Sequence, residues 1–147
     1  MKLSLINLCV VIALIATFLS MKVDNGKKDL LCHKWVQFAF KRNSDTVPTL
    51  VDKALAKTCV FNPNGDYVEV MGLKATGHYY LNATQTKLAF QFQMMNGKTF
   101  AQSADTTKHY NYVILKLTKD TLIYGQEALY GEKRVYGHDD WYFVRAK

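Results

Sequence analysis

The sequence predicts an all-β domain, an eight-stranded antiparallel up-and-down barrel, with a β-sandwich as the alternative. Three observations carry this prediction. Aromatic residues make up 13% of the chain, with nine Tyr, eight Phe and two Trp, and such side chains suit a half-buried pleated surface. Residues 88–94 alternate large apolar side chains with small or polar ones, which is the period of a strand. Asn62-Pro63-Asn64-Gly65 and Asn96-Gly97 are hairpin turn signals.

We expect the first 20 residues to be a signal peptide or, if they are retained, an N-terminal anchor. Lys2 is followed by an apolar run from Leu3 to Leu19 and then by a polar stretch, an order typical of secretory signals. The run is close to the lower length limit of a membrane span, which keeps the anchor as an alternative. Residues 21–29 are then a polar linker and residues 30–147 the folded domain. Such a protein is exported, to the periplasm, the outer surface or the medium.

Turn residues divide the domain into eight short strands. We expect a polar connection over 41–53 that contains Pro48, with a helical turn between Thr49 and Lys57. The expected strands are Leu31–Phe40, Ala56–Phe61, Asp66–Met71, Gly77–Leu81, Leu88–Met94, His109–Leu117, Thr121–Gln126 and Trp141–Arg145. Short sequential connections favour antiparallel neighbours, and closing the sheet removes its exposed edges. A barrel is therefore favoured over a sandwich.

Five segments carry a resemblance to a known family: LLCHKW, CVFNPNGDYVEV, GHYYLN, YVILKLTKDTLIY and the terminal WYFVR. In this order they resemble the small lipocalin-like domain proteins exported by Gram-negative gut anaerobes, which are distant relatives of lipocalins. Lipocalins carry a Trp on the first strand and an Arg near the end of the last strand that packs over it. Trp35 and Arg145 match these positions, and the resemblance implies a cation–π contact that seals one end of the barrel. His33 stands where lipocalins have glycine, so the resemblance is a distant one.

One face of each strand lines the interior of such a barrel, where we expect a ligand. Aromatic side chains with polar tips suit a small apolar or amphipathic molecule. The residues expected to line the site are Tyr67, His78, Tyr80, Phe90, Phe92, Met94, Val113 and Leu115. An eight-stranded barrel is just wide enough for side chains to fill it or for one small ligand. A filled barrel with a protein-interaction or structural role is therefore the alternative.

Removal of a signal peptide leaves two cysteines, Cys32 and Cys59, in or beside two strands that are expected to be neighbours. In an exported domain, both a disulfide and two free thiols are compatible with this placement. No metal site is expected, because no further cysteine or close histidine completes a ligand spacing. Asp139–Asp140 beside His138 is interpreted as a solvated turn. No haem or other cofactor is expected.

The chain carries a formal net charge of +7, but its lysines are spread over expected turns and outward strand positions. Scattered lysines protect strand edges, so nucleic acid is not an expected partner. A membrane is a partner only through a retained N-terminal segment. The sequence motifs of serine hydrolases, phosphate-binding loops and zinc proteases are absent. The sequence thus predicts a binding protein and not an enzyme, with the oligomeric state unspecified.

Overall fold

The computed structural model describes residues 26–42, 44–99, 110–126 and 139–147. The expected signal peptide or anchor lies outside these residues, as do His109 and His138. Within the described part of the chain, no helix is both long enough and apolar enough to cross a membrane.

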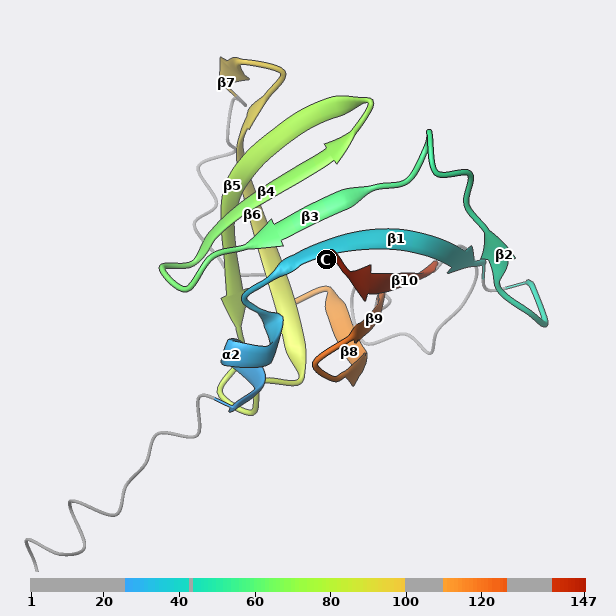
Figure 1. Cartoon of the computed structure of the whole chain (residues 1–147). Helices are drawn as coiled ribbons and strands as arrows, with labels where there is room; N and C mark the ends of the chain where they lie inside the picture. Colours follow the sequence, from blue (N-terminus) through green and yellow to red (C-terminus); the bar gives the residue numbers. More distant parts are fainter. Residues whose placement is uncertain (1–25, 43, 100–109, 127–138) are drawn as a thin grey trace, which may run out of the picture.

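Ten antiparallel strands form one sheet in the described residues, and eight of them close into a barrel (Figure 1). The eight strands are β1 (Lys34–Lys41), β3 (Thr58–Phe61), β4 (Asp66–Met71), β5 (Leu73–Leu81), β6 (Lys87–Met95), β8 (Tyr112–Leu117), β9 (Thr121–Gln126) and β10 (Asp140–Arg145). Each pairs with the next, and β10 pairs with β1 to close the ring. Two short strands, β2 (Thr49–Leu50) and β7 (Lys98–Thr99), add to β1 and β6. This up-and-down closure confirms the predicted fold class.

Two local differences separate the observed strands from the expected ones. β5 begins at Leu73, earlier than the expected Gly77, because Gly72 turns the chain directly after β4. Gly72 has a φ of 72°, which glycine adopts without steric cost. Thr49–Leu50 pairs with β1 as a short strand, so the helical turn expected between Thr49 and Lys57 is wrong at this point.

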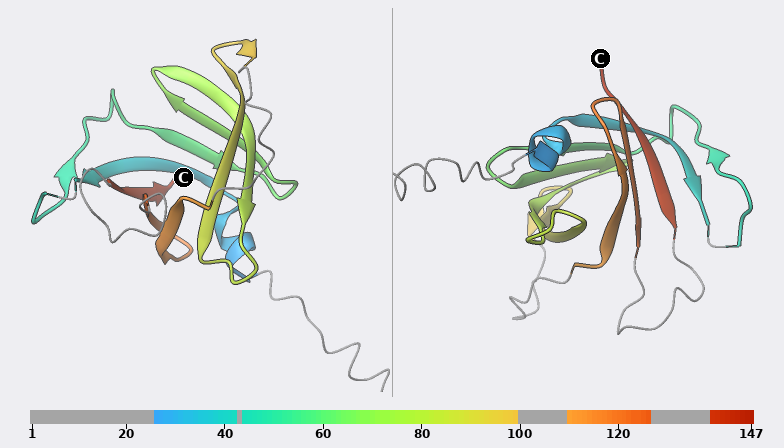
Figure 2. Two further views of the ribbon diagram at one scale, coloured as in Figure 1. Left: turned by 180° about the vertical axis from the view of Figure 1, so that it is seen from behind. Right: turned by 90° about the horizontal axis from the view of Figure 1, so that it is seen from below.

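A short helix, α2 (Gly26–Leu31), lies at the end of the barrel where β5 ends and β6 begins (Figures 1 and 2). It occupies the last part of the expected linker over 21–29 and continues into the domain. Leu31 is fully buried, and the indole Nε1 of Trp35 donates a hydrogen bond of 2.9 Å to the Leu31 carbonyl. The Leu31 side chain, this hydrogen bond and a second one from the Lys28 N–H to the Gln85 side chain thus hold a mostly polar segment against the barrel.

Aromatic rings pack the interior of the barrel. The Tyr67 ring on β4 lies 4.6 Å from that of Phe90 on β6 and 5.0 Å from that of Phe61 on β3, between ring centroids. On the facing wall, Tyr124 of β9 stacks on Phe143 of β10 at 5.3 Å. Such pairs each add about 0.5–1.5 kcal/mol beyond the free energy of area burial. The fully buried neighbours of these rings are Leu31, Trp35, Cys59, Leu88 and Leu122. The inner faces of the strands therefore form a packed core.

Candidate functional site

A cavity of about 370 Å³ lies at the mouth of the barrel, the end opposite α2. At this end β1 extends beyond β3 and pairs with β2 instead, which brings the chain from Leu50 to Leu55 over the rim. The residues that line this mouth cavity are Gln37, Phe40, Arg42, Leu50, Val51, Asp52, Leu55, Met71, Asp139 and Trp141. It is therefore built from β1, β10, the end of β4 and the segment that contains β2.

Apolar side chains form most of the walls of the mouth cavity. Phe40 and Trp141 lie opposite each other in the register of β1 and β10, so their side chains share a face of the sheet. At the rim, Leu50, Leu55 and Met71 are 78%, 72% and 56% exposed. Exposed apolar side chains that gather around a cavity are typical of binding sites.

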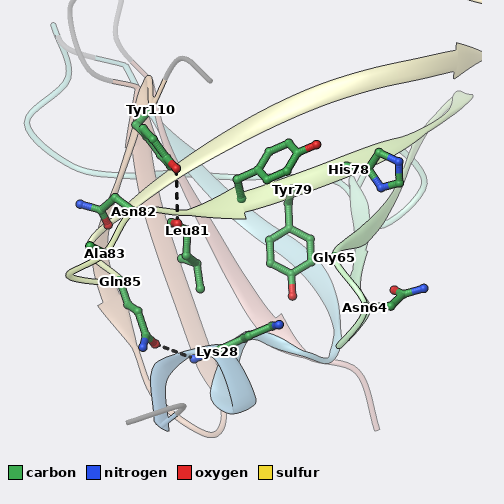
Figure 3. Close-up of a pocket in the computed structure, with 11 residues that line it drawn as sticks. Lys28, Asn64, Gly65, His78, Tyr79, Leu81, Asn82, Ala83, Gln85 and Tyr110 are labelled. Atoms are coloured by element: carbon green, nitrogen blue, oxygen red, sulfur yellow. Dashed lines mark hydrogen bonds between the residues drawn. The ribbon is translucent and has the colours of Figure 1, made fainter. Parts of the chain in front are cut away.

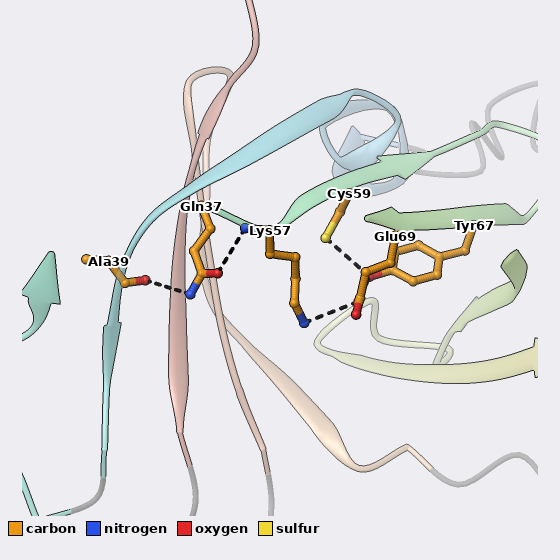
Figure 4. A network of polar contacts seen from close by, with 6 residues as sticks. All are labelled: Gln37, Ala39, Lys57, Cys59, Tyr67 and Glu69. Carbon is orange, nitrogen blue, oxygen red and sulfur yellow. Dashed lines mark hydrogen bonds and ion pairs between the residues drawn. The ribbon is translucent and has the colours of Figure 1, made fainter. Parts of the chain in front are cut away.

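An ion pair lies inside the barrel, between the mouth cavity and the aromatic core (Figure 4). The ammonium of Lys57 is 3.2 Å from Oε2 of Glu69, and the two side chains are only 12% and 19% exposed. The same ammonium lies over the ring of Trp141, 5.4 Å from its centroid. The Tyr67 hydroxyl donates a hydrogen bond of 2.6 Å to the same Glu69 oxygen. Because Trp141 also lines the mouth cavity, the ion pair is one side chain away from any molecule bound there.

Gln37 joins the ion pair to the mouth cavity. Its backbone N–H donates to the Lys57 carbonyl at 2.8 Å, and its side-chain oxygen accepts the Lys57 N–H at 3.4 Å. Its side-chain nitrogen donates to the carbonyl of Ala39 at 3.3 Å, as Figure 4 shows. Gln37 is 6% exposed, and a buried amide is stable only when its polar atoms are paired. These bonds fix the backbone that carries Lys57.

The tyrosines around Glu69 stay protonated. Burial raises the pKa of Tyr67, Tyr124 and Tyr112, and the negative charge of Glu69 adds to the rise at each of them. Their hydroxyls are therefore hydrogen-bond donors at neutral pH. A fixed carboxylate, a fixed ammonium and neutral phenols thus form a paired polar network behind Gln37 and Trp141, which line the mouth cavity.

Three of the eight predicted lining residues lie inside the barrel. Tyr67 is 1% exposed, and Phe90 and Phe92 pack against the buried cluster. All three belong to the aromatic core and not to the walls of the mouth cavity. The inward orientation predicted for them is thus observed, while their role in binding stays a prediction.

Two predicted lining residues on β5 face outward. The prediction that His78 and Tyr80 point into the barrel is wrong, because the buried positions are Gly77 and Tyr79. A Cβ atom on Gly77 would lie 2.1 Å from a backbone oxygen of β6. The inner face of β5 therefore has a glycine at this point, and the next inward residue is Tyr79. His78 lies on the outer surface, with its Nδ1 3.1 Å from a carboxylate oxygen of Asp66.

A bulge moves Met94 to the outer face of β6. The register passes from Gly77 opposite Phe92 to Thr76 opposite Met94, so one residue of β6 has no direct partner. A bulge of this kind reverses the faces of the residues that follow it. Met94 consequently shares the outer face with Thr76 and is 41% exposed, which corrects its predicted inward orientation.

The orientation predicted for β8 is reversed. Tyr112 pairs with the fully buried Leu88, and Tyr112 and Ile114 pack against the core. Val113 and Leu115 therefore face outward, and Leu115 is 45% exposed. All four residues of the run 112–115 are apolar or aromatic. Period-two alternation therefore does not indicate which of them face inward. Tyr112 faces inward because its ring packs against other rings of the interior, with its centroid 5.9 Å from that of Trp141.

Trp35 and Arg145 lie opposite each other in the register of β1 and β10, but the cation–π contact expected between them is not formed. Trp35 is fully buried, whereas Arg145 is exposed. The ring that packs edge-on against Trp35 is His33, at 6.2 Å between centroids. Burial and the charge of Arg145 lower the pKa of His33. Cation–π contacts are instead made by Lys57 over Trp141 and by Arg42 over Phe40.

Cys32 and Cys59 are free thiols, which is the second of the two alternatives compatible with the sequence. Cys59 points into the core, where its sulfur lies 3.2 Å from the hydroxyl of Tyr67. Cys32 follows α2, and its sulfur lies 3.3 Å from the hydroxyl of Tyr79. Each thiol thus has a tyrosine as its partner, and the two tyrosines come from different strands.

We expect alkylation to distinguish the two thiols. Burial raises the pKa of Cys59 to about 12, and the thiolate is the reactive form of cysteine. Iodoacetamide at pH 8 is therefore expected to modify the partly exposed Cys32 and to spare Cys59 until denaturant is added. Peptide mass spectrometry measures both sites. Equal labelling in the native protein, or a peptide pair joined by a disulfide, would contradict this expectation.

Lys57, Glu69 and Gln37 are not among the predicted lining residues, although the sequence contains a signal for two of them. Glu69 follows Tyr67 by two positions on one strand, and Lys57 precedes Cys59 by two positions. Side chains two positions apart face the same side of a strand. A charged residue two positions away from a buried residue on the same strand therefore indicates an internal polar site.

The chain matches no family model, and no curated protein or solved structure is significantly similar to it. In the described ranges, no group of three or more His, Cys, Asp or Glu side chains is placed to hold a metal ion. The resemblance to lipocalin-like proteins stays a prediction.

Proposed function

We propose that this protein is an exported, lipocalin-like binding protein that takes a small amphipathic molecule at the mouth cavity. The observation that carries the proposal is a largely apolar cavity, with Arg42, Asp52 and Asp139 also in its lining, and a fixed polar network at its inner end. The apolar part of the ligand packs against Phe40, Leu55 and Trp141. Its polar group lies toward Gln37, next to the ion pair. The proposed role is binding without catalysis.

The size of the mouth cavity limits the ligand. A volume of about 370 Å³ is near the lower end of small-molecule sites, which span roughly 300–1,000 Å³. The aromatic core closes the barrel beyond the ion pair, so a long chain has no room to enter fully. The proposed ligand is therefore short, or it leaves part of its body outside the rim.

Export is the other half of the proposal. It is supported by the order of Lys2, the apolar run Leu3–Leu19 and the polar stretch that follows. The site of action is then the periplasm, the outer surface or the medium. The N-terminal residue of the mature protein distinguishes a cleaved signal peptide from a retained anchor.

The binding test uses a small fluorescent fatty-acid analogue and two matched phenylalanine variants. Phe40→Ser, in the mouth cavity, is expected to weaken binding of the analogue about 10-fold, because burying a phenylalanine contributes about 1.5–3 kcal/mol. Phe38→Ser is the control, since Phe38 is on the same strand but outside the mouth cavity and is 38% exposed. If both variants bind as the unchanged protein does, or the analogue does not bind at all, the proposal fails.

One observation favours a second candidate function. Leu50, Leu55, Met71 and Leu73 are each more than half exposed near the mouth, with fractions from 52% to 78%. A barrel could use such a rim to dock a partner protein. Native mass spectrometry of protein purified from its own host distinguishes the two functions. A co-purifying small molecule supports the ligand-binding proposal, whereas a bound polypeptide supports the interaction module.

A further inference from the structure

The sequence contains three Asn-Gly dipeptides, and two of them lie in turns within the described ranges. Asn64–Gly65 lies between β3 and β4, in a turn that borders a pocket beside α2 (Figure 3). Asn96–Gly97 joins β6 to β7, at the end of the molecule away from α2 (Figure 1). Both asparagines are exposed, whereas Asn25 of the third dipeptide lies outside the described residues. The same dipeptide is therefore present in two different surroundings.

An Asn-Gly dipeptide can modify itself without an enzyme. The backbone nitrogen of the glycine attacks the side-chain carbon Cγ of the asparagine, loses its proton and displaces ammonia, which leaves a five-membered succinimide ring. Water then opens the ring at either carbonyl and gives aspartate or isoaspartate. Glycine permits this attack because it has no Cβ atom that hinders the approach. The reaction therefore needs an unrestrained amide side chain and a glycine nitrogen that can move toward it.

Hydrogen bonds hold both reacting groups at Asn64–Gly65. The side-chain nitrogen of Asn64 donates to a carboxylate oxygen of Asp66 at 2.8 Å, and its side-chain oxygen accepts the Asp66 N–H at 3.0 Å. The Gly65 N–H donates to the carbonyl of Asn62 at 3.0 Å, and the Gly65 carbonyl accepts the N–H of Tyr79 at 2.8 Å. An attack on Asn64 therefore has to break several of these bonds first.

The corresponding groups of Asn96–Gly97 are not held in this way. Neither the Asn96 side chain nor the Gly97 N–H is hydrogen-bonded to any residue within the described part of the chain. The backbone N–H of Asn96 donates to the Lys74 carbonyl at 2.7 Å, but it takes no part in the reaction. Beyond its chain neighbours, no described atom lies within 4 Å of the place that a Cβ atom on Gly97 would take. The reacting groups of this turn are therefore free to meet.

We propose that Asn96–Gly97 is a self-modification site, at which Asn96 converts to isoaspartate with water as the co-reactant, and that the same dipeptide at residues 64–65 is protected by its hydrogen bonds. Each conversion releases one ammonia and takes up one water. The product carries a carboxylate where Asn96 carried a neutral amide. Because these residues do not line the mouth cavity, the proposal does not depend on ligand binding there.

The modification changes the turn between β6 and β7. Asn96 and Gly97 have φ values of 53° and 78°, as a type I′ turn requires, and this turn pairs Met95 with Lys98. In isoaspartate the backbone runs through the former side chain and gains one CH₂ group, so the turn geometry is lost. We therefore expect weaker pairing of β7 with β6 in the modified protein.

The test follows both asparagines in one sample. The native protein is incubated at pH 8 and digested at intervals, and peptide mass spectrometry measures the conversion of amide to acid at each position. Asn96 is expected to convert at least about 10-fold faster than Asn64, because each hydrogen bond that has to break raises the barrier. This comparison needs no variant, so it is independent of any effect of substitution on folding.

Unfolding and one substitution show whether the structure sets the ratio of the two rates. In urea, where the turns are lost, Asn64 and Asn96 are expected to convert at similar rates. Asp66→Ala removes one partner of the Asn64 side chain and is expected to raise the Asn64 rate without changing that of Asn96. Fragmentation of the modified peptide distinguishes isoaspartate from aspartate. Equal rates in the native protein, a ratio that persists in urea, or aspartate as the main product would each overturn the proposal.

Discussion

Replacing Trp35 with alanine is expected to lower the free energy of unfolding by about 4 kcal/mol. Trp35 is fully buried. It lies near the start of β1, the strand that follows α2 and pairs with both β3 and β10. Its removal leaves a large cavity and takes away one of the two donors to the Leu31 carbonyl. Domains of this size have a total stability of about 5–15 kcal/mol, so this single change removes a large part of it.

Urea denaturation measures the effect, with two variants as controls. Trp35→Phe keeps most of the buried volume but removes the indole N–H, one of two donors to the Leu31 carbonyl beside the His33 N–H, and we expect a loss of about 1–2 kcal/mol. Val144→Ala, on β10 and 42% exposed, is expected to change stability by less than about 1 kcal/mol. If Trp35→Ala lowers the free energy of unfolding by less than Trp35→Phe does, Trp35 does not anchor the barrel.

The barrel itself was predictable because its signals are local. Turn residues such as Asn64-Gly65 and Asn96-Gly97 mark hairpins, and β4 and β9 have the predicted bounds. Once eight strands follow one another through short connections, closure is the simplest way to satisfy both edges. The prediction of fold class therefore needed only the spacing of turns and the period of strands.

The facing of individual residues was less predictable, because it depends on bulges and on packing. In the run Tyr112–Leu115 every residue is apolar or aromatic, so period two cannot select a face. On β5, the close approach of the β6 backbone to Gly77 determines that Tyr79 is inside. On β6, a bulge turns Met94 outward after Phe92. The two effects on β5 and β6 arise between strands, so the sequence of a single strand does not specify them, and the facing of the uniformly apolar run is determined by packing.

The mouth cavity could not be predicted from the sequence for a related reason. Its walls come from β1, β10, the end of β4 and the segment containing β2, which are far apart in the sequence. Leu50 lies in the expected polar connection over 41–53, and Leu55 in the helical turn expected between Thr49 and Lys57. Only the pairing of β2 with the outer part of β1 brings them to the rim.

Breaking the ion pair inside the barrel is expected to cost about 3 kcal/mol, whichever partner is removed. Lys57→Met leaves the Glu69 carboxylate without its ammonium, and Glu69→Gln leaves the ammonium without a carboxylate. Both side chains are less than one-fifth exposed, so water compensates poorly for the missing charge. The double variant is expected to be more stable than either single one, because it buries no unpaired charge. Urea unfolding of all four proteins gives the coupling free energy, for which we expect about 2 kcal/mol or more.

The surface pair of His78 and Asp66 provides the comparison. Its side chains are 36% and 48% exposed, and exposed ion pairs contribute about 0–1 kcal/mol, so Asp66→Asn should have a small effect. A coupling of this small size between Lys57 and Glu69 would contradict the description of their pair as buried.

The double variant of Lys57 and Glu69 also separates stability from recognition. If the pair orients the polar group of a ligand, the double variant folds but loses affinity for the fluorescent fatty-acid analogue. If the pair only supports the core, affinity and stability recover together.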